Sequence, residues 1–448
     1  MPSTSVCNRQ LTLEKNGNTD GRSFRYWQVR TILCTMLGYA FFYFIRKNLS
    51  VALPSIEADL GIGKVQLGVF LTLHGLLYGV SRLVNGMIAD RTNARVFMCL
   101  GLLLSVLMNV WFGCSSLAFT LGLAWVVNGW VQGMGAPPCA RLMTHWIPPK
   151  KLASLMTVWN ASHSIGAFAA VVACGWIVSA GLGWRSCFFL PAAFCALGTA
   201  FLWWGIRDTP KRVGLPELGE AADAKPAQAA KAPFAEILVH YVFRNRVIWV
   251  LALANFFVYV VRFGILDWGF SMLREQYPGI SPFMASVVLG GFEFAGIFGM
   301  MASGWATDRF FGSRCPRTCA ICMAAAAGFV LLFSMLSPTS TPWYVAALVL
   351  GGAGFFTYGP QALIGVASAN IATKEAAGTA TGFTAIFGYL STLVSGIGVG
   401  WVATHWGWQH VLYLLAGAAL LGLVLFVSIW NAASDGYGSR QGGSAAGH

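Results

Sequence analysis

Charged residues are scarce in this sequence. They make up only 10% of the 448 residues, and Asp and Glu together number 16. Soluble domains carry about 25% charged residues, so the composition excludes an ordinary soluble enzyme. Intrinsic disorder requires low hydrophobicity and high net charge, whereas this chain is 56% hydrophobic. At about 20 apolar residues per crossing, the length allows roughly a dozen membrane spans.

The short motifs of catalysis are also missing. The sequence has no P-loop, no H-E-x-x-H and no G-x-S-x-G. We therefore expect no enzyme and no cofactor. The 11 cysteines are scattered through apolar runs and indicate no disulfide framework. Cys315, Cys319 and Cys322 have no His or carboxylate nearby, so we expect no metal site.

Long apolar runs fall into two groups of six with a polar break between them. This pattern predicts an all-α membrane protein with twelve transmembrane helices in two pseudo-symmetric six-helix bundles. The predicted parts are an N-terminal segment (1–30), a first bundle (31–206), a mobile linker (207–245), a second bundle (246–431) and a tail (432–448). The runs are 31–56, 66–89, 96–115, 117–143, 152–180, 184–206, 246–276, 281–306, 316–337, 341–370, 376–402 and 408–431.

Basic residues collect in alternate loops. Lysine and arginine are enriched in cytoplasmic loops, so both termini and the linker are expected to be cytoplasmic, in a bacterial inner membrane. The formal net charge of +13 then needs no nucleic-acid partner. The opposite loops hold only Lys64, Arg185 and Arg274. The expected cytoplasmic loops hold Arg91, Arg95, Lys150, Lys151, Arg207, Lys211, Arg212, Arg244, Arg314, Arg317 and Lys374.

One motif occurs in both halves. GMIADR follows the second run and contains Asp90 and Arg91, and GWATDR follows the eighth run and contains Asp308 and Arg309. Each copy thus follows the second run of its own half. An Asp-Arg pair can simply end a helix at the membrane surface. The matched positions favour internal duplication instead, with a conformational role for both loops. Duplicated halves place a substrate site at their interface near mid-membrane.

Arginine also occurs at matched depths in the two halves. Arg46 lies in the first run of the first half, and Arg262 lies in the first run of the second half. A charge at mid-membrane costs about 2.5–3.5 kcal/mol on insertion scales, so it persists when paired, hydrated or functional. A guanidinium is always charged and grips phosphate or carboxylate with two parallel hydrogen bonds. The pair therefore predicts a site for one dianion, unless internal carboxylates neutralise both arginines.

Four further charges lie inside apolar runs. Lys47, Asp267 and Glu293 are interpreted as one structural or gating cluster, which leaves Arg46 and Arg262 without carboxylate partners. Arg82 lies nearer the expected cytoplasmic end of its helix. It either contacts substrate or extends to the membrane surface.

A sparse polar patch surrounds His163 within an otherwise apolar run. Asn160 lies one helical turn before it. Histidine has an ordinary pKa near 6.5, close to the second ionisation of a phosphate ester at about 6. His163 either follows the protonation state of such a ligand or is a satisfied core residue. The tyrosine hydroxyls that are best placed to donate to phosphate oxygens belong to Tyr39, Tyr43, Tyr259 and Tyr389.

From about residue 24 to 431 the chain resembles the major facilitator superfamily, and more narrowly the organophosphate:phosphate antiporters. The glycerol-3-phosphate and hexose-6-phosphate transporters belong to this group. The matching stretches are GYAFFYFIRKN (38–48), YGVSR (78–82), DRTNAR (90–95), QGMGAPPC (132–139), WNASH (159–163), VYVVRFGILDW (258–268), YGPQALIG (358–365) and KEAAGTATGFTAIFGYL (374–390).

The resemblance implies two rocking bundles that exchange an external organic phosphate for internal inorganic phosphate. It also implies that no ATP is used and that a monomer is sufficient. The phosphate-gripping arginines of the family fall on Arg46 and Arg262, and its substrate-site histidine falls on His163. Its supporting tyrosines fall on Tyr39, Tyr43, Tyr259, Tyr358 and Tyr389.

Several positions depart from the family pattern. Arg82 replaces the usual Lys, Ala136 replaces a bulky aromatic, and Ser164 replaces Asn. Thr381 and Thr384 replace the acidic and basic residues of hexose-phosphate transporters, which favours a smaller ester such as glycerol 3-phosphate. The YGPQ stretch resembles the hexose-phosphate branch instead. The ester, whether a glycerol, hexose or glycerate phosphate, stays open at this point.

A second hypothesis comes from another class of protein. The family also includes a hexose-phosphate receptor that signals to a membrane histidine kinase, and it keeps the same fold and arginines. A transporter-like sensor with a two-component kinase as its partner is therefore the alternative to a transporter. An intramembrane enzyme acting on phosphate esters would need a nucleophile or a metal cluster near the arginines, and the sequence offers neither.

Overall fold

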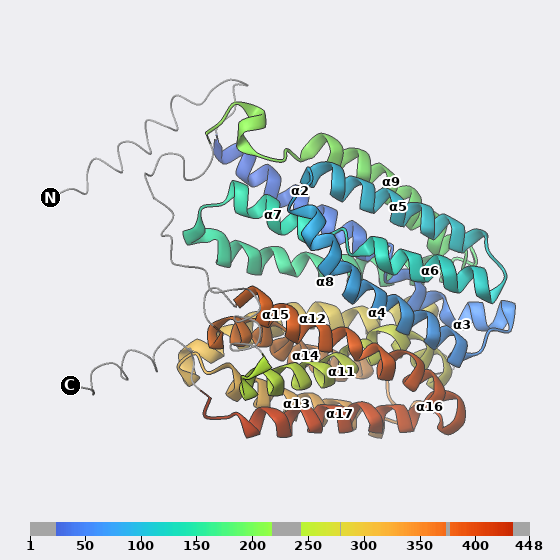
Figure 1. The fold of residues 1–448 in the computed structure, drawn as a ribbon. Coiled ribbons are helices and arrows are strands. Elements are labelled where there is room, and N and C mark those ends of the chain that lie inside the picture. The colour runs from blue at the N-terminus through green and yellow to red at the C-terminus, as the bar shows by residue number, and fades with distance from the viewer. Residues whose placement is uncertain (1–23, 217–242, 278, 373–376, 433–448) are drawn as a thin grey trace, which may run out of the picture.

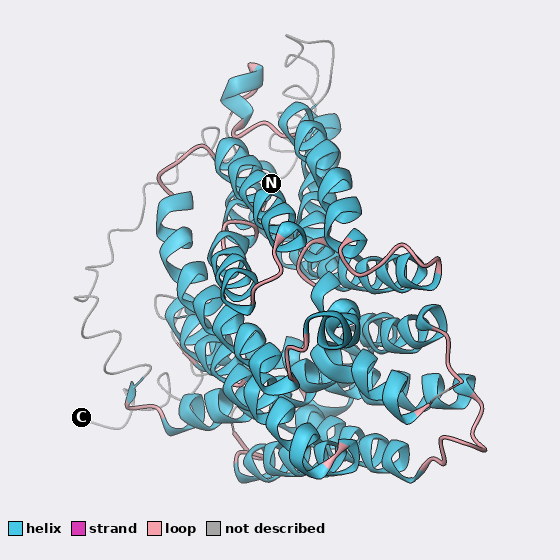
Figure 2. Cartoon of the chain, turned by 90° about the vertical axis from the view of Figure 1, so that its right-hand side faces the viewer, coloured by secondary structure: helices cyan, strands magenta, loops and turns pink. Residues whose placement is uncertain are grey.

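The computed structural model describes residues 24–216, 243–277, 279–372 and 377–432, and these form helices and loops with no strand (Figure 2). Most of the predicted linker, Lys374, the N-terminal segment 1–23 and the tail from residue 433 lie outside the described residues.

The described residues of the first half form eight α-helices and a short 3-10 helix. Two apolar runs each give two helices, because Arg46 and Lys47 interrupt one run and Gly133 and Gly135 interrupt the other. The helices are α2 (Phe24–Phe44), α3 (Asn48–Leu60), α4 (Lys64–Ala89), α5 (Ala94–Cys114), α6 (Ala118–Gln132), α7 (Ala136–Trp146), α8 (Pro149–Ser179), α9 (Ser186–Gly205) and η1 (Pro210–Val213).

In the second half, the residues that the structure describes form seven α-helices and one π-helical segment. The apolar run 376–402 is divided among α15, η3 and α16. The elements are α11 (Arg246–Gln276), α12 (Pro282–Phe311), α13 (Cys315–Met335), α14 (Trp343–Ile371), α15 (Ala377–Leu390), η3 (Leu393–Gly398), α16 (Val399–Trp406) and α17 (Trp408–Ser428).

Eleven helical stretches in the described part of the chain are long and apolar enough to cross a membrane, and two of them, Phe24–Leu60 and Thr379–Trp406, join consecutive elements. The apolar run 117–143 supplies a further crossing through α6, with 15 residues, and α7, with 11 residues. Each is too short to cross alone, since a helix rises only about 1.5 Å per residue, but the two follow one another across the bundle. Gly133 and Gly135 separate them, and both lie against side chains of neighbouring helices where a Cβ would not fit.

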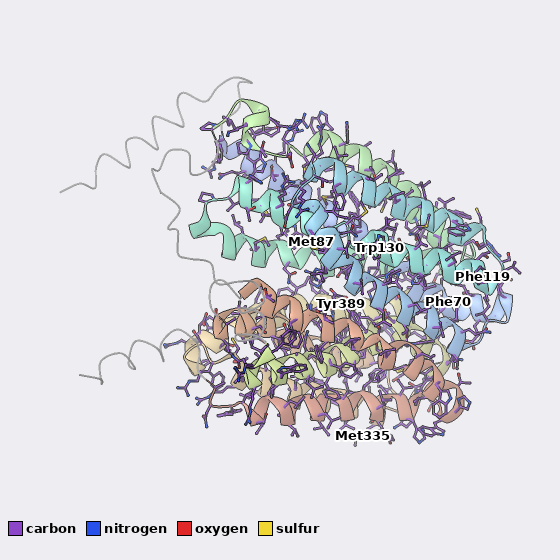
Figure 3. All side chains as sticks on the ribbon, in the orientation of Figure 1. Phe70, Met87, Phe119, Trp130, Met335 and Tyr389 are labelled. Carbon is purple, nitrogen blue, oxygen red and sulfur yellow. The ribbon has the colours of Figure 1, made fainter. Side chains whose placement is uncertain are left out.

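The helices form two bundles that lie one above the other in Figure 1, with α2–α9 in one and α11–α17 in the other. We call the side on which α2 begins and α17 ends the terminal side, at the left of Figure 1. The opposite side is the far side. The outer surface is strongly apolar: Phe119 and Met335 point away from the bundles and are 78% and 77% exposed (Figure 3). Such a surface fits a protein surrounded by lipid.

The bundles touch closely along a far-side seam, formed by residues 64–75 of α4 with Glu275, Thr392, Gly396 and Ile397. Thr72 Oγ1 donates to the carbonyl of Thr392 at 2.8 Å and accepts from the N–H of Ile397 at 2.9 Å. A Cβ on Gly68 would lie 2.8 Å from the carbonyl oxygen of Gly396. The wide turn of the π-helix η3 thus directs backbone polar groups toward α4, where Thr72 satisfies them.

The first residues of the predicted linker, 207–215, pack against the first bundle. Trp146 Nε1 donates to the carbonyl of Arg207 at 3.0 Å, and Asp208 accepts from the N–H of Ala94 at 2.8 Å. Leu215 is buried with the first bundle. Residues 207–215 therefore belong with that bundle. The limits of the remaining predicted parts stay predictions.

Close helix packing in the second bundle depends on glycine. A Cβ on Gly299 of α12 would overlap the carbonyl oxygen of Phe355 in α14 and lie 2.6 Å from its carbonyl carbon. We predict that Gly299→Ala separates α12 from α14 and destabilises the protein by about 1–3 kcal/mol. Gly291→Ala in the same helix is the control, because a Cβ there meets nothing within 4 Å. Thermal unfolding of the two detergent-solubilised variants checks this, and equal melting temperatures would contradict it.

Candidate functional site

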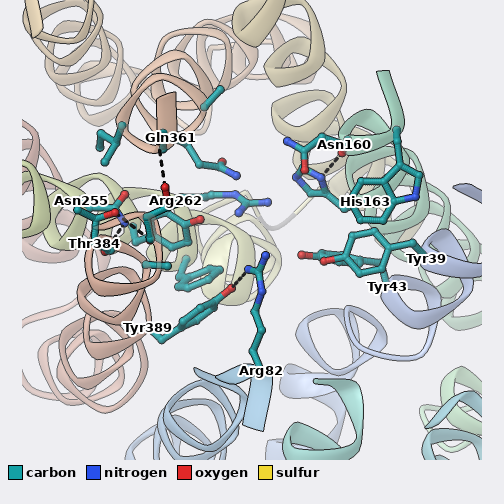
Figure 4. Close-up of a pocket in the computed structure, with 18 of the residues that line it drawn as sticks. Tyr39, Tyr43, Arg82, Asn160, His163, Asn255, Arg262, Gln361, Thr384 and Tyr389 are labelled. Carbon is teal, nitrogen blue, oxygen red and sulfur yellow. Dashed lines mark hydrogen bonds between the residues drawn. The ribbon is translucent and has the colours of Figure 1, made fainter. Parts of the chain in front are cut away.

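A cavity of about 260 Å³ lies between the bundles, and both halves of the chain line it. Figure 4 shows Tyr39, Tyr43 and His163 facing Asn255, Thr384 and Tyr389 across it. The predicted arginines Arg46, Arg82 and Arg262 all reach this one cavity. Its wall also includes Tyr39, Tyr43, Trp159, Asn160, His163, Asn255, Tyr259, Phe263, Gln361, Thr381, Thr384, Ala385 and Tyr389.

A helix break positions Arg46. Between α2 and α3, the Ile45 carbonyl turns away from the helix and accepts from the side-chain amides of Asn109 at 3.0 Å and Asn128 at 3.4 Å. These buried amides satisfy a backbone group that the break would otherwise leave unpaired in an apolar bundle. The sequence showed Asn109 and Asn128 only as isolated polar residues within apolar runs, so their role was missed.

Arg46 reaches the cavity without a carboxylate partner. Its guanidinium carbon lies 3.8 Å from the ring centre of Tyr78 and 5.3 Å from that of Tyr43. The ion pairs of the described residues do not include it. Aromatic faces stabilise a cation but do not neutralise its charge. The predicted lack of a carboxylate beside Arg46 agrees with this geometry.

The surroundings of Arg262 differ from the prediction. Its Nη2 lies 3.6 Å from Oε1 of Glu293, a side chain that is 0% exposed. Neither Glu293 oxygen has a hydrogen-bond partner among the described atoms, and Nε and Nη2 of Arg262 have none either. The pair is therefore held by charge attraction at a distance too long for a good hydrogen bond. Arg262 keeps donor capacity for a further anion.

The predicted three-residue charge cluster is divided in two. Lys47 Nζ donates to Asp267 Oδ1 at 2.7 Å across the bundle interface, whereas Glu293 pairs with Arg262. The helix break explains the division. Lys47 follows Arg46 and points toward the far side of α11, so it reaches Asp267 rather than Glu293.

Arg82 turns into the cavity instead of extending to the membrane surface. Its Nη1 donates to the hydroxyl of Tyr389 at 2.9 Å, and this bond joins α4 to α15 (Figure 4). Tyr389 also packs edge-on against Tyr78, whose ring lies under Arg46. Arg46 and Arg82 are thus linked through tyrosines rather than through carboxylates.

His163 presents one ring nitrogen to the cavity. Its Nδ1 donates to the carbonyl of Asn160, one helical turn earlier, and this bond fixes the ring orientation. Nε2 has no partner among the described atoms and is buried. In the neutral ring this nitrogen accepts a hydrogen bond, and in the charged ring it donates one. A ligand in the cavity is the available partner in either form.

The predicted tyrosines divide into two groups. Tyr39, Tyr43, Tyr259 and Tyr389 line the cavity. Tyr358 is fully buried behind Arg262, whose guanidinium carbon lies 4.6 Å from the tyrosine ring centre. Tyr358 therefore supports Arg262 from behind and is not part of the cavity wall.

The duplicated motifs lie outside the cavity on the terminal side, with Asp90 and Arg91 in the turn after α4 and Asp308 and Arg309 in the last turn of α12. Asp90 and Arg91 are exposed, and Asp308 accepts from Ser313 Oγ at 2.7 Å. Another residue holds the first loop: Arg141 donates to the carbonyls of Ala89 and Thr92. The structure brings none of the four motif residues to the arginines, and their conformational role stays a prediction.

Net charge decides which ligand the cavity favours. The wall contains three guanidinium groups, and Glu293 behind it is the adjacent carboxylate. Lys47 and Asp267 neutralise one another. With Glu293 ionised, two positive charges remain uncompensated in a site that lipid and apolar side chains surround. An anion with two negative charges is the complementary ligand.

Comparison with known proteins agrees with this architecture. Residues 35–396 match the family model of the Major Facilitator Superfamily, and the chain belongs to this family. Its fold resembles that of a bacterial homologue of the human lysosomal transporter Spinster in an inward-facing, unoccupied conformation. That structure gives a TM-score of 0.68 at 17% identity, covering 90% of this chain and 94% of the other. The predicted twelve-helix, two-bundle membrane fold is confirmed.

Relatives with about a third of aligned residues identical to this chain include transporters and a sensor. A probable hexose phosphate transport protein of Chlamydia trachomatis is 37% identical over 92% of this chain and 93% of its own length. The membrane sensor protein UhpC of Escherichia coli is 35% identical, over 91% and 93%. The glycerol-3-phosphate transporter of Bacillus subtilis is 35% identical, over 91% and 94%. The family and these names indicate a transporter-type membrane protein rather than an enzyme, as predicted.

The pairing of Arg262 with Glu293 can be tested by removing its members in turn. We predict that Arg262→Gln costs about 3–5 kcal/mol of stability, because it leaves the Glu293 carboxylate buried without a cation. The double variant R262Q/E293Q is expected to recover most of that loss. Thermal unfolding of purified protein measures both. A double variant that is no more stable than R262Q would show that Glu293 is not the cause.

Proposed function

We propose that this protein exchanges a phosphate ester for inorganic phosphate by alternating access of one central site. The observation that supports this most strongly is the cavity with three arginines and one carboxylate behind it. Phosphate and its monoesters carry close to two negative charges at neutral pH and present oxygens to forked donors. The names of the relatives include transporters of hexose phosphate and of glycerol 3-phosphate.

In the proposed complex each half of the protein contributes one arginine to the phosphoryl group. Arg46 and Arg262 bind its oxygens from opposite bundles, and Arg82 adds a third guanidinium. Tyrosine hydroxyls at 39, 43 and 259 complete the donors, since these side chains line the same cavity. His163 Nε2 accepts from a monoprotonated phosphate when neutral and donates to a dianion when charged.

Exchange, rather than one-way transport, follows from charge. In the empty site the positive charges on the two bundles repel one another, which opposes closure around the cavity. A bound dianion attracts both sets of arginines and lowers the energy of the closed, switching state. Only a ligand that binds this state more tightly accelerates switching. Phosphate and its esters share the group that does so.

The structure supports a starting state that is closed on the far side. Lys64 Nζ lies 3.1 Å from Glu275 Oε1, and Ser179 Oγ accepts from the N–H of Phe283 at 2.8 Å. Together with the Lys47–Asp267 pair and the far-side seam, these contacts join the bundles beyond the arginines. Alternating access requires all of them to separate, so we assign Lys47 and Asp267 to the gate.

Orientation follows from the distribution of basic residues. On the described terminal-side turns lie Arg91, Arg95 and Arg317, whereas the far side holds Lys64, Arg185 and Arg274. We assign the terminal side to the cytoplasm and the far side to the exterior. The relatives are bacterial, which supports a bacterial inner membrane as the location. A single chain contains both halves of the site, so a monomer is sufficient.

A sensor of sugar phosphate is the second candidate. It is favoured by the similarity to membrane sensor protein UhpC. This chain is 35% identical to UhpC and 35% identical to the glycerol-3-phosphate transporter. A sensor would use the same arginines to bind its ligand and would pass the change to a histidine kinase. Ligand-dependent thermal stabilisation of purified protein without phosphate flux would favour this candidate over the transporter.

Replacing the arginines tests the transport proposal. Arg46→Gln and R262Q/E293Q are each expected to reduce exchange of labelled phosphate in phosphate-loaded proteoliposomes by at least about tenfold, because each removes charge-assisted hydrogen bonds of about 1.5–3 kcal/mol. Arg317→Gln is the control, since this arginine bonds the backbone of Trp430 at the terminal side, remote from the cavity. Full exchange in both site variants, with normal thermal stability, would contradict the proposal.

Cross-linking tests whether the far side must open. Lys64 pairs with Glu57 of its own bundle at 3.0 Å and with Glu275 of the other bundle at 3.1 Å. In a background without the native cysteines, a cleavable cross-link between K64C and E275C is expected to stop phosphate exchange, and reduction is expected to restore it. A cross-link between K64C and E57C is the matched control and should leave exchange intact. Undiminished exchange with the first cross-link would contradict alternating access through this side.

A further inference from the structure

To the terminal side of Arg46 and Arg262, the cavity wall includes several uncharged side chains. Four residues line this part, which we call the neutral subsite: Tyr39, Trp159, Asn255 and Gln361. We propose that the neutral subsite binds the ring of a sugar phosphate, so that the transported ester is a hexose phosphate rather than a glycerol or glycerate phosphate. This inference rests on the proposed function, because it assigns the organic part of the ligand whose phosphate the arginines bind.

Helix geometry places the neutral subsite at a definite depth. Asn255 precedes Arg262 by two turns in α11, which is about 10 Å along the axis and returns to the same face of the helix. Gln361 follows Tyr358 by one turn toward the terminal side in α14. Trp159 precedes His163 by one turn in α8. Asn255 and Trp159 therefore lie two turns and one turn, respectively, to the terminal side of residues assigned to the phosphoryl group. Gln361 lies one turn to the terminal side of Tyr358, which packs behind Arg262.

Two amide oxygens in this wall have no partner among the described atoms. Asn255 Nδ2 donates to the Thr384 carbonyl at 2.8 Å, which fixes the amide and leaves Oδ1 as an acceptor. Asn255 is only 5% exposed, and neither its Oδ1 nor Oε1 of Gln361 has a hydrogen bond. A buried acceptor without a donor costs about 1–3 kcal/mol. Ligand hydroxyls in the cavity would supply the missing donors.

Thr384 acts through Asn255 rather than on the ligand. Its own hydroxyl donates to the Thr381 carbonyl at 3.0 Å and accepts from Ser368 Oγ at 3.4 Å. The single hydroxyl proton of Thr384 is thus used inside the second bundle, and the oxygen keeps only acceptor capacity. The lack of charge at positions 381 and 384, which favoured a smaller ester from sequence alone, therefore does not argue against a sugar.

The opposite wall of the neutral subsite is aromatic. The rings of Tyr39 and Trp159 stack with centres 4.8 Å apart and planes 20° from parallel. Trp159 Nε1 is buried and has no acceptor among the described atoms. The cavity wall thus combines an aromatic surface from the first bundle with two uncharged amide side chains from the second, and each of these contains a polar atom without a partner among the described atoms. Both walls are uncharged.

This combination matches the chemistry of a sugar ring. A pyranose has apolar C–H faces that pack on an aromatic surface and hydroxyls around its edge that both donate and accept. A glycerol chain is too short to reach residues one to two turns beyond the phosphate, and it has no ring face to cover the aromatic wall. A glycerate carboxylate would meet amide oxygens there instead of a cation, since the described cavity wall has no lysine and its three arginines are engaged with the phosphate.

Competition against phosphate exchange separates the sugar subsite from the phosphate site. Labelled phosphate exchange is measured in phosphate-loaded proteoliposomes containing the full-length protein, with glucose 6-phosphate, glycerol 3-phosphate and 3-phosphoglycerate as competitors. For the unaltered protein, glucose 6-phosphate is expected to compete best. Gln361→Met is expected to weaken competition by glucose 6-phosphate about tenfold, the effect of one lost hydrogen bond to a buried group. Competition by glycerol 3-phosphate, measured relative to phosphate self-exchange of the same variant, is expected to weaken less than competition by glucose 6-phosphate.

The tryptophan offers a matched pair of variants. Trp159→Leu removes the aromatic surface and is expected to weaken glucose 6-phosphate competition at least as much as Gln361→Met, whereas Trp159→Phe keeps an aromatic surface and should retain most of it. Equal losses for all competitors, or glycerol 3-phosphate as the best competitor for the unaltered protein, would overturn the inference. Absence of phosphate exchange in the unaltered protein would instead overturn the proposed transport. The subsite is then decided by whether glucose 6-phosphate stabilises this protein thermally more than it stabilises Gln361→Met.

Discussion

Uncompensated positive charge in an apolar environment organises this structure. Arg46 is placed in the membrane interior by a helix break, and the described carboxylates do not approach it closely enough to pair. A charge in this position is energetically costly unless a ligand of opposite charge neutralises it. The surrounding aromatic rings lower that cost without neutralising the charge, so the site retains its attraction for an anion. Arg262 shares its charge with Glu293 at 3.6 Å and remains able to bind a second oxygen group.

The scaffold around the arginines explains how two bundles can present them to one ligand. Asn109 and Asn128 hold the break before Arg46, and Tyr358 supports Arg262 from behind. On the far side, glycines bring α4 and η3 into backbone contact, and Thr72 satisfies the polar groups that the π-helix exposes. Such a seam is held by short, directional contacts over a small area. It can separate as a unit when the bundles rock, provided that the ligand lowers the barrier.

The long apolar runs were sufficient to predict the fold. A membrane span must satisfy its backbone groups within a helix and therefore appears in the sequence as a long apolar run. The runs did not predict the division of the fourth run at Gly133 and Gly135, which depends on side chains of other helices. The arginines stood out because charge is rare in apolar sequence. The partner of Glu293 could not be predicted, since the choice between Lys47 and Arg262 depends on the direction in which each side chain leaves its helix. Asn255 and Gln361 are neutral and common residue types, and only their unpaired oxygens in the folded protein mark them.

The central claim is that a bound dianion, and not the empty site, allows the bundles to switch. The most direct test is release of labelled phosphate from proteoliposomes into medium with and without unlabelled phosphate. The account predicts rapid release into phosphate-containing medium and release at least about tenfold slower into phosphate-free medium, because the empty carrier must then return with its arginines unpaired. Equal rates of release in the two media would contradict it.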